Sequence, residues 1–239
     1  MEKKRLIIID GSSLLSTSFY GTAGAYLMAK TEEDKVKAME KLLKAPDGRY
    51  TNGVYTFMKT LLNIVKNQKP SHLAVVWDIS RNTFRQNIAG VEGSYKGHRK
   101  ETPDPLKEQF KTTQELLEGI VPQFKSGFDD EFIYEADDFA GSLVRRFESE
   151  IPCYCYTKDE DYLQLISEHG CRVWLVTSRS DEMFEELGMN AKDFDLPQGV
   201  FEYNLETFKY FKGLNHPLDF IDAKGLMGDK SDNIPGVKG

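Results

Sequence analysis

The stretch Leu6-Ile7-Ile8-Ile9-Asp10-Gly11 decides the fold. An apolar run that stops at an aspartate and a glycine is typical of a buried strand ending at a loop. A second run, His72 to Trp77, ends at Asp78, and apolar residues at helical spacing over 53–67 lie between the two runs, before Pro70. Strand, helix and strand in this order predict a βαβ unit, whose two strands are parallel.

The same alternation continues along the chain. We expect helices over 105–120 and from Glu135, a strand over 153–157, a short helix over 160–166 and a strand over 172–176. This pattern favours an α/β fold with a central, mainly parallel sheet and helices on both faces. The charged segment 25–44 and the acidic, loop-like segment 178–198 interrupt the alternation, and we expect both to be surface excursions.

Composition limits the class of protein. The chain has 239 residues, of which 40% are hydrophobic, enough for a substantial core. Only four apolar residues precede Asp10, too few for a signal peptide, and no stretch approaches the roughly 18 apolar residues of a membrane span. We therefore expect a cytoplasmic protein without membrane contact, and we separately expect it to be a monomer. Cys153, Cys155 and Cys171 form no CxxC pair, which indicates reduced thiols without a metal role.

The net charge of −7 argues against a nucleic-acid partner only as an average. The segment 81–100 carries five lysines and arginines against the single acid Glu92, and it contains the aromatic residues Phe84 and Tyr95. Cations for phosphates and rings for unpaired bases are what a groove for single-stranded nucleic acid requires. Because this segment leaves from Asp78, it predicts a basic arch over the sheet edge; a solvated loop is the alternative interpretation.

Carboxylates recur where strands end and helices begin. Asp10 and Asp78 follow strands, and ligands of open parallel sheets bind beyond the carboxyl ends of the strands. Three further sets follow along the chain: Glu135, Asp137 and Asp138; Asp159 and Asp161; Asp229 and Asp232. Each set alone is explained by helix capping or by an Asx turn. Their joint occurrence at such positions instead indicates a shared site.

All-oxygen ligands favour Mg²⁺, with Mn²⁺ as the alternative, over zinc. Two such ions would support in-line displacement at a phosphodiester. The four histidines occupy no triad-like setting, and neither a GxGxxG nor a Walker sequence occurs. The residues alone are compatible with two-metal chemistry at a phosphodiester, and helix capping stays open as the alternative interpretation at this point.

These motifs together resemble those of the 5′-3′ exonuclease domain of bacterial DNA polymerase I and its free-standing phage and flap endonuclease relatives. The resemblance runs from Leu6 to Gly239. It is carried by Ile9-Asp10-Gly11-Ser12-Ser13, Thr83-Phe84-Arg85, Tyr95-Lys96, Glu135-Ala-Asp137-Asp138, Thr157-Lys-Asp159-Glu-Asp161 and Gly228-Asp229-Lys-Ser-Asp232-Asn233-Ile-Pro-Gly236. It implies a PIN-like 5′ nuclease core over 1–215, which includes the arch at about 80–104, and a truncated helix–hairpin–helix over 216–239.

The resemblance also implies roles for particular residues. The ligands of two divalent ions, direct or through water, would be Asp10, Asp78, Glu135, Asp137, Asp138, Asp159, Asp161, Asp229 and Asp232. The catalytic residues would be Lys96, Asp137 and Asp138. The residues in contact with DNA would be Arg85, Tyr95, Lys96, Arg99, Lys224, Gly236, Lys238 and Gly239. The expected substrate is DNA with a 5′ single-stranded flap or a 5′ end.

Two other functions stay open at this point. A PIN-like ribonuclease would use the same acids, and a comparison of matched RNA and DNA flaps separates it from a DNA nuclease. A protein that binds DNA structures without turnover is the other, because Thr17 stands where the family usually carries an arginine and the helix–hairpin–helix is only half present.

Overall fold

The computed structural model describes residues 4–80, 83–87, 95–97, 101–127 and 132–237. Its centre is a sheet of six strands in the order β3-β2-β1-β4-β5-β6. The strands are β1 (Leu6–Asp10), β2 (His72–Val76), β3 (Gln123–Phe124), β4 (Cys153–Thr157), β5 (Cys171–Val176) and β6 (Val200–Tyr203). Strands β1 to β5 are parallel, and β6 runs antiparallel to β5. The predicted α/β fold with a mainly parallel sheet is confirmed.

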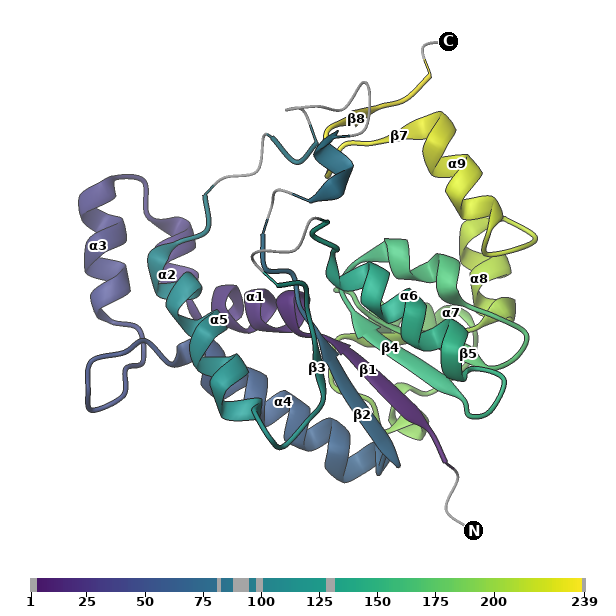
Figure 1. Cartoon of the computed structure of the whole chain (residues 1–239), viewed down its shortest axis with the longest axis horizontal. Helices are drawn as coiled ribbons and strands as arrows, with labels where there is room; N and C mark the ends of the chain where they lie inside the picture. The colour runs from purple at the N-terminus through teal and green to yellow at the C-terminus, as the bar shows by residue number, and fades with distance from the viewer. Residues whose placement is uncertain (1–3, 81–82, 88–94, 98–100, 128–131, 238–239) are drawn as a thin grey trace.

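Helices cover both faces of this sheet (Figure 1). On one face α1 (Gly11–Thr22), α4 (Asn52–Gln68) and α5 (Asp104–Leu117) pack on Ile7, Ile9 and Trp77. On the other, α6 (Ala136–Phe147), the 3₁₀ helix η2 (Glu160–Leu165), α7 (Ser180–Glu186) and α8 (Leu205–Lys212) pack on Ile8 and its neighbours. Alternate residues of β1 thus enter two separate cores, which is why its sequence is apolar throughout.

Helix α4 shows how the sequence places an element. Val54, Phe57, Leu61 and Ile64 recur at spacings of three and four, and all four are buried, whereas Tyr55 is exposed. Burial of one such side chain contributes roughly 1.5–3 kcal/mol. The helix ends at Gln68, and the following residue, Lys69, takes a left-handed conformation (φ 45°) just before Pro70. The predicted helix over 53–67 is therefore confirmed.

Three expectations need correction. Helix α5 ends at Leu117 rather than near residue 120, because Gly119 adopts a left-handed conformation with φ of 72°. Segment 178–198 is not wholly loop-like: it forms α7 and the 3₁₀ helix η3 (Ala191–Phe194), and α7 buries Met183 and Phe184 in the core. The strands β3 and β6 were not predicted, because β3 has two residues and β6 carries Glu202 in an otherwise apolar run.

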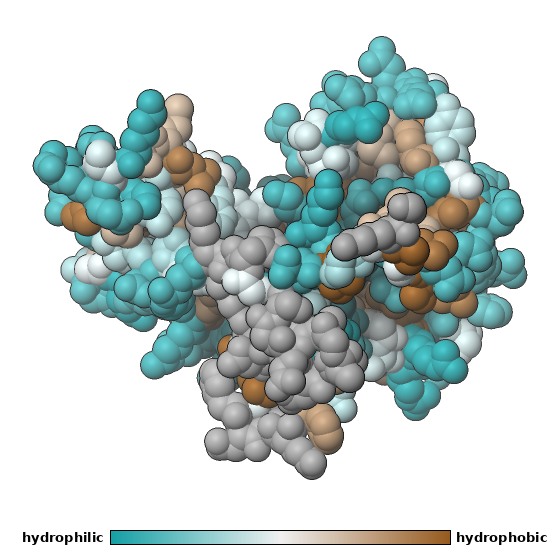
Figure 2. All heavy atoms as spheres, turned by 90° about the horizontal axis from the view of Figure 1, so that it is seen from above, coloured by the Kyte–Doolittle hydropathy of each residue, from teal (hydrophilic) through white to brown (hydrophobic). Residues whose placement is uncertain are grey.

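Segment 25–44 lies largely in α2 (Gly24–Met28) and α3 (Glu32–Glu40). Helix α3 packs against α2 and projects from the body of the molecule (Figure 1). Seen from above the carboxyl edge of the sheet, this projection and the opposite side of the molecule stand apart, with a hollow between them (Figure 2).

The chain leaves the sheet through α9 (Asp219–Met227) and a small hairpin of β7 (Gly228–Asp229) and β8 (Ile234–Pro235). A Cβ atom at Gly228 would collide with the backbone of Gly236, and one at Gly236 would collide with the carbonyl of Met227. Both positions therefore need glycine for the hairpin to close on α9. A helix followed by a hairpin agrees with the start of a helix–hairpin–helix, which remains a prediction. In the described part of the chain, every helix is too short or too polar to cross a bilayer.

Candidate functional site

Asp10 lies at the carboxyl end of β1 and caps the N-terminus of α1. Its carboxylate accepts hydrogen bonds from the Ser13 amide at 2.9 Å and from Thr157 Oγ1 at 2.7 Å. The side chain is buried, with the residue only 5% exposed. Burial, together with the nearby charge of Asp78, raises the pKa of Asp10 to about 7. Asp10 is fixed in position, and its ionised form is unfavourable in this buried site. A bound cation would stabilise that ionised form.

Asp78 follows β2 and joins three elements. Its amide donates to Ser12 Oγ at 2.8 Å, at the start of α1. Its Oδ1 accepts from the Ala136 amide at 2.8 Å, at the start of α6. The strand end β2 is thereby fixed to two helix N-termini, whose dipoles favour negative charge. The meeting of Asp10 and Asp78 at one sheet edge agrees with the expectation from the strand ends.

Glu135 is the N-cap of α6, with an extended backbone, and the helix begins one residue later than expected, at Ala136. Its buried carboxylate accepts from Thr83 Oγ1 at 2.9 Å, from the Tyr95 hydroxyl at 3.2 Å and from Lys96 Nζ at 2.5 Å. Two described parts of the predicted arch are therefore bound to the start of α6. Because burial and the charge of Glu135 disfavour the phenolate, the pKa of Tyr95 is well above its ordinary range.

Arg85 provides a second attachment between the predicted arch and α6. Its two terminal nitrogens each donate to one oxygen of Asp138 at 2.8 Å, the bidentate geometry that guanidinium groups favour. Asp138 also accepts from the Glu135 amide at 2.9 Å, as the third residue of a helix often does for its cap. Asp138 is thus well satisfied by the protein itself.

Asp137, next to Asp138, has a carboxylate oxygen whose hydrogen-bonding capacity is not met by the described residues. Its Oδ1 atom is buried and has no hydrogen-bond partner among the described residues, and the nearest cation, Arg85 Nη2, is 3.8 Å away. Burial raises the pKa of Asp137 to about 7, although Arg85 opposes the shift. A buried oxygen without a donor is costly unless a further group binds it. This oxygen therefore fits a metal ion.

Asp159 caps η2 after β4 and accepts from the Asp161 amide at 2.9 Å. Its own amide donates to Thr157 Oγ1 at 3.0 Å, and the same hydroxyl donates to Asp10. Thr157 therefore links the ends of β1 and β4. We call Asp10, Asp78, Glu135, Asp137, Asp138 and Asp159 the sheet-edge acid group.

A second group lies beside it. Asp161, Asp229 and Asp232 each place one carboxylate oxygen within 4.8 Å of the others, and we call them the hairpin acid group. Lys224 of α9 lies between two of these acids: its Nζ bonds to Asp161 and, at 2.6 Å, to Asp229 Oδ2. Burial works against the ammonium, but the hydrogen bonds to Asp161 and Asp229 raise the pKa of Lys224 above its ordinary range.

The arch and the hairpin also touch directly. The Lys96 amide donates to the Asp232 carbonyl oxygen at 2.9 Å, and Lys96 takes a positive φ of 55°. Lys96 thus joins the two acid groups, with its amide on one and its ammonium on the other.

The structure brings most predicted site residues to one edge of the sheet, but their roles as ligands or catalysts remain predictions. Arg99, Lys238 and Gly239 lie outside the described residues. Sequence reasoning did not single out Ser12, Thr83 and Thr157, whose hydroxyls orient the acids. Their position beside or within the acidic motifs was the available signal.

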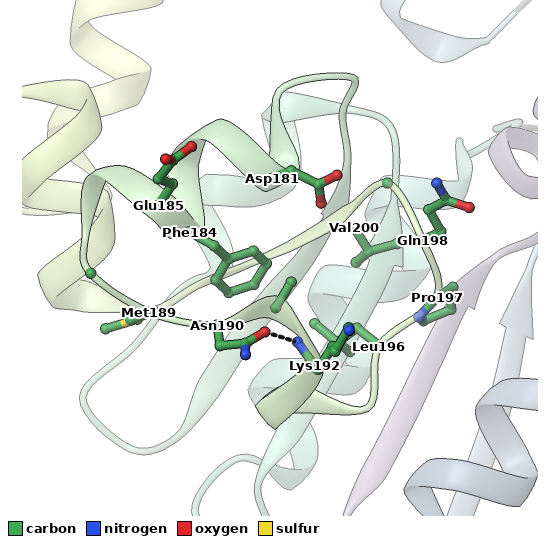
Figure 3. A pocket seen from close by; sticks show the side chains of 13 residues that line it. Asp181, Phe184, Glu185, Met189, Asn190, Lys192, Leu196, Pro197, Gln198 and Val200 are labelled. Atoms are coloured by element: carbon green, nitrogen blue, oxygen red, sulfur yellow. Dashed lines mark hydrogen bonds between the residues drawn. The ribbon is translucent and has the colours of Figure 1, made fainter.

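A pocket of about 720 Å³ lies elsewhere, between α7, η3 and the start of β6 (Figure 3). Phe184, Leu196 and Val200 give it an apolar side, and Asp181, Glu185 and Lys192 lie at its edge. None of the predicted site residues lines it.

Comparison with known proteins agrees with this geometry. A family model described as 5′-3′ exonuclease, N-terminal resolvase-like domain, matches residues 5–193. DNA polymerase I of Bacillus subtilis is 33% identical over 239 residues, which are all of this chain and 22% of that protein. A 5′-3′ exonuclease of Halalkalibacterium halodurans is 30% identical, over all of this chain and 67% of that protein. The chain thus spans about a fifth of the polymerase.

A solved structure adds support for the fold. It is a bacteriophage T5 flap endonuclease in a pseudo-enzyme-product complex with DNA and metal ions. The TM-score is 0.64 at 20% identity, and the match covers 99% of this chain and 71% of that one. At this identity the likeness shows the fold alone.

Proposed function

The chain belongs to the 5′-3′ exonuclease family, and we propose that it is a divalent-metal-dependent 5′ nuclease that hydrolyses phosphodiester bonds in DNA with a 5′ flap or 5′ end. One observation carries this proposal. Acids from separate segments of the chain meet at one sheet edge, where Asp137 Oδ1 is buried without a donor among the described residues.

The donor set fits hard cations. The predicted ligands are nine carboxylates, and the set includes no histidine or cysteine. A ligand set made of oxygen atoms alone favours Mg²⁺ or Mn²⁺. Asp10, Asp78, Asp137 and Asp159 would hold one ion, and the hairpin acid group would hold the other. When bound, two such ions would act as Lewis acids for in-line displacement at phosphorus and would lower the pKa of the attacking water.

The remaining residues position the substrate. Among the described residues, Lys96 and Arg85 are the arch cations that pair with the acids, so they would bind the phosphate that faces the sheet edge. The predicted contact of Tyr95 with DNA does not fit its burial, because the residue is only 6% exposed and Lys96 Nζ lies over its ring; Tyr95 would instead hold Glu135 and Lys96 in place. In the absence of DNA the same cations neutralise Glu135 and Asp138, so DNA binding would exchange carboxylate partners for phosphate.

The test is cleavage of an end-labelled 5′-flap DNA, with a matched RNA flap alongside. We expect release of the DNA flap in Mg²⁺ or Mn²⁺ and none with a chelator. Asp10→Asn should lower the rate at least about a thousandfold. Asp181→Asn, the same change at an exposed acid of the distant pocket, should cleave as the wild type does.

Other outcomes would overturn the proposal in different ways. Cleavage of only the RNA flap would assign a ribonuclease. Flap binding in Ca²⁺ without cleavage in Mg²⁺ or Mn²⁺ would assign a protein that binds DNA structures without turnover.

A further inference from the structure

Lys224 occupies a position that the proposed function gives to a metal ion. Its Nζ bonds to carboxylate oxygens of Asp161 and Asp229, two of the three acids of the hairpin acid group. These acids come from η2 and from β7, and Lys224 comes from α9, so the lysine lies where three elements meet.

The surroundings of Lys224 hold its ammonium at this position. Asp161, Asp229 and Lys224 have side chains that are 25%, 15% and 28% exposed, so the ion pairs are partly shielded from water. The ring of Phe220, one turn earlier on α9, lies 5.7 Å from Lys224 Nζ. On the other side, Ser231 donates two hydrogen bonds to Asp229 Oδ1, at 2.7 and 2.6 Å, which leaves Oδ2 to the lysine.

A divalent ion bound by the hairpin acid group would compete with the ammonium, because Lys224 Nζ already contacts oxygen atoms of Asp161 and Asp229. Three carboxylates within 4.8 Å repel one another unless a cation balances them. Lys224 carries one positive charge and bonds to two of these acids, whereas a divalent ion carries two charges and binds several oxygens at once. Both cations cannot occupy the space between Asp161 and Asp229.

We propose that Lys224 is a resident counter-cation of the hairpin acid group, and that a divalent ion binds there only by displacing it. This inference rests on the proposed function for the assignment of the hairpin acid group as an ion site. Metal binding at this position is then a cation exchange, in which the lysine side chain leaves the acids as the ion enters. In the metal-free protein, the lysine keeps η2, β7 and α9 together.

The first experiment measures Mn²⁺ binding without DNA, by calorimetry and by electron paramagnetic resonance of free Mn²⁺. Lys224→Met should bind Mn²⁺ at this position about fivefold more tightly or better, the lower end of typical coupling between two ligands. Without metal, the melting temperature of Lys224→Met should fall below that of the wild type. Addition of Mg²⁺ should raise the melting temperature of Lys224→Met by more than it raises that of the wild type. Unchanged or weaker Mn²⁺ binding would overturn the proposal.

Lys212→Met is the matched control. Lys212 also lies 5.7 Å from the Phe220 ring and pairs with an acid of the η2 region, Glu160 at 2.8 Å, but it bonds to none of the hairpin acid group. Its Mn²⁺ affinity should equal that of the wild type. An equal gain in both variants would show a general charge effect and would also overturn the proposal.

A second measurement does not depend on the folding of Lys224→Met. In wild-type protein with ¹³C-labelled lysine, the side-chain signal that is missing from Lys224→Gln should move on addition of Mg²⁺, while that of Lys212 stays. A Lys224 signal that does not move at saturating Mg²⁺ would contradict the exchange. Neither readout involves cleavage, so an inactive wild type that shows the exchange would refute only the proposed function. An active wild type without the exchange would refute only this inference.

Discussion

The two acid groups differ in what balances their charge. In the sheet-edge acid group, Lys96 and Arg85 pair with Glu135 and Asp138. Asp10 and Asp137, by contrast, make no hydrogen bond to a cation among the described residues, and burial raises their pKa values to about 7. In the hairpin acid group a lysine lies among the acids, and its hydrogen bonds keep the pKa of Asp229 below its usual range in spite of partial burial. Adjacent acids of one proposed site can therefore await a cation in two ways. Some are buried, so that their ionisation is unfavourable until a cation binds, and others pair with a lysine that the cation would replace.

The largest expected effect comes from Asp137, at the least satisfied oxygen. Asp137→Asn removes a charge that burial disfavours, so we expect a higher melting temperature without metal. The same change removes a proposed ligand, so flap cleavage should fall at least about a thousandfold. Calcium-supported DNA binding, measured by fluorescence anisotropy, should stay close to that of the wild type. A lower melting temperature would show that the buried charge of Asp137 does not destabilise the metal-free protein.

A smaller loss is expected at Lys96, which joins the two groups. Lys96→Met leaves Glu135 with only the more distant Arg85, at 3.8 Å, among the described cations, and it removes a proposed phosphate contact, so single-turnover cleavage should fall about a hundredfold. Lys107→Met provides the control, because Lys107, on the exposed side of α5, pairs among the described residues with Glu101 and Asp104 and with none of the predicted ligands. A loss of similar size in both variants would assign the effect to overall charge.

Arg85 should matter less, because its charge survives a conservative change. Arg85→Lys keeps the cation but cannot make two parallel hydrogen bonds to Asp138. We expect about a tenfold slower cleavage, which corresponds to about 1.4 kcal/mol. Arg179→Lys, at the exposed pair with Glu182, should leave the rate unchanged. Full activity in Arg85→Lys would show that the bidentate contact does not position the arch.

The smallest effect concerns pH and the stability of the metal-free protein. Because the folded-state pKa of Asp10 is raised to about 7, its contribution to stability is present at low pH and is lost as pH rises towards 7. Melting temperatures in chelator should therefore fall from pH 5 to pH 7 by a few degrees, on the order of 1 kcal/mol per pH unit. Asp10→Asn should flatten this slope, and Asp181→Asn should not. A slope that is unaltered in Asp10→Asn would place the titration elsewhere.

The local elements could be read from the sequence because their signals are local. The apolar run Leu6 to Ile9 and the spacing of Val54, Phe57, Leu61 and Ile64 required burial on particular faces, and the strand β1 and helix α4 follow. The sequence also located the nine acids at strand ends and helix starts, and family motifs suggested that they belong together.

Only the tertiary structure decided which of the acids have a cationic partner within the protein. Lys224 and Asp161 are far apart in the chain, and no periodicity relates α9 to η2, so their pairing had no sequence signal. The same holds for Thr157, whose hydroxyl links Asp10 to Asp159, and for Arg85, which pairs with Asp138 across the sheet edge. Residue type fixes the charge of a group, but its neighbours fix the free energy of that charge, and neighbours are set by packing.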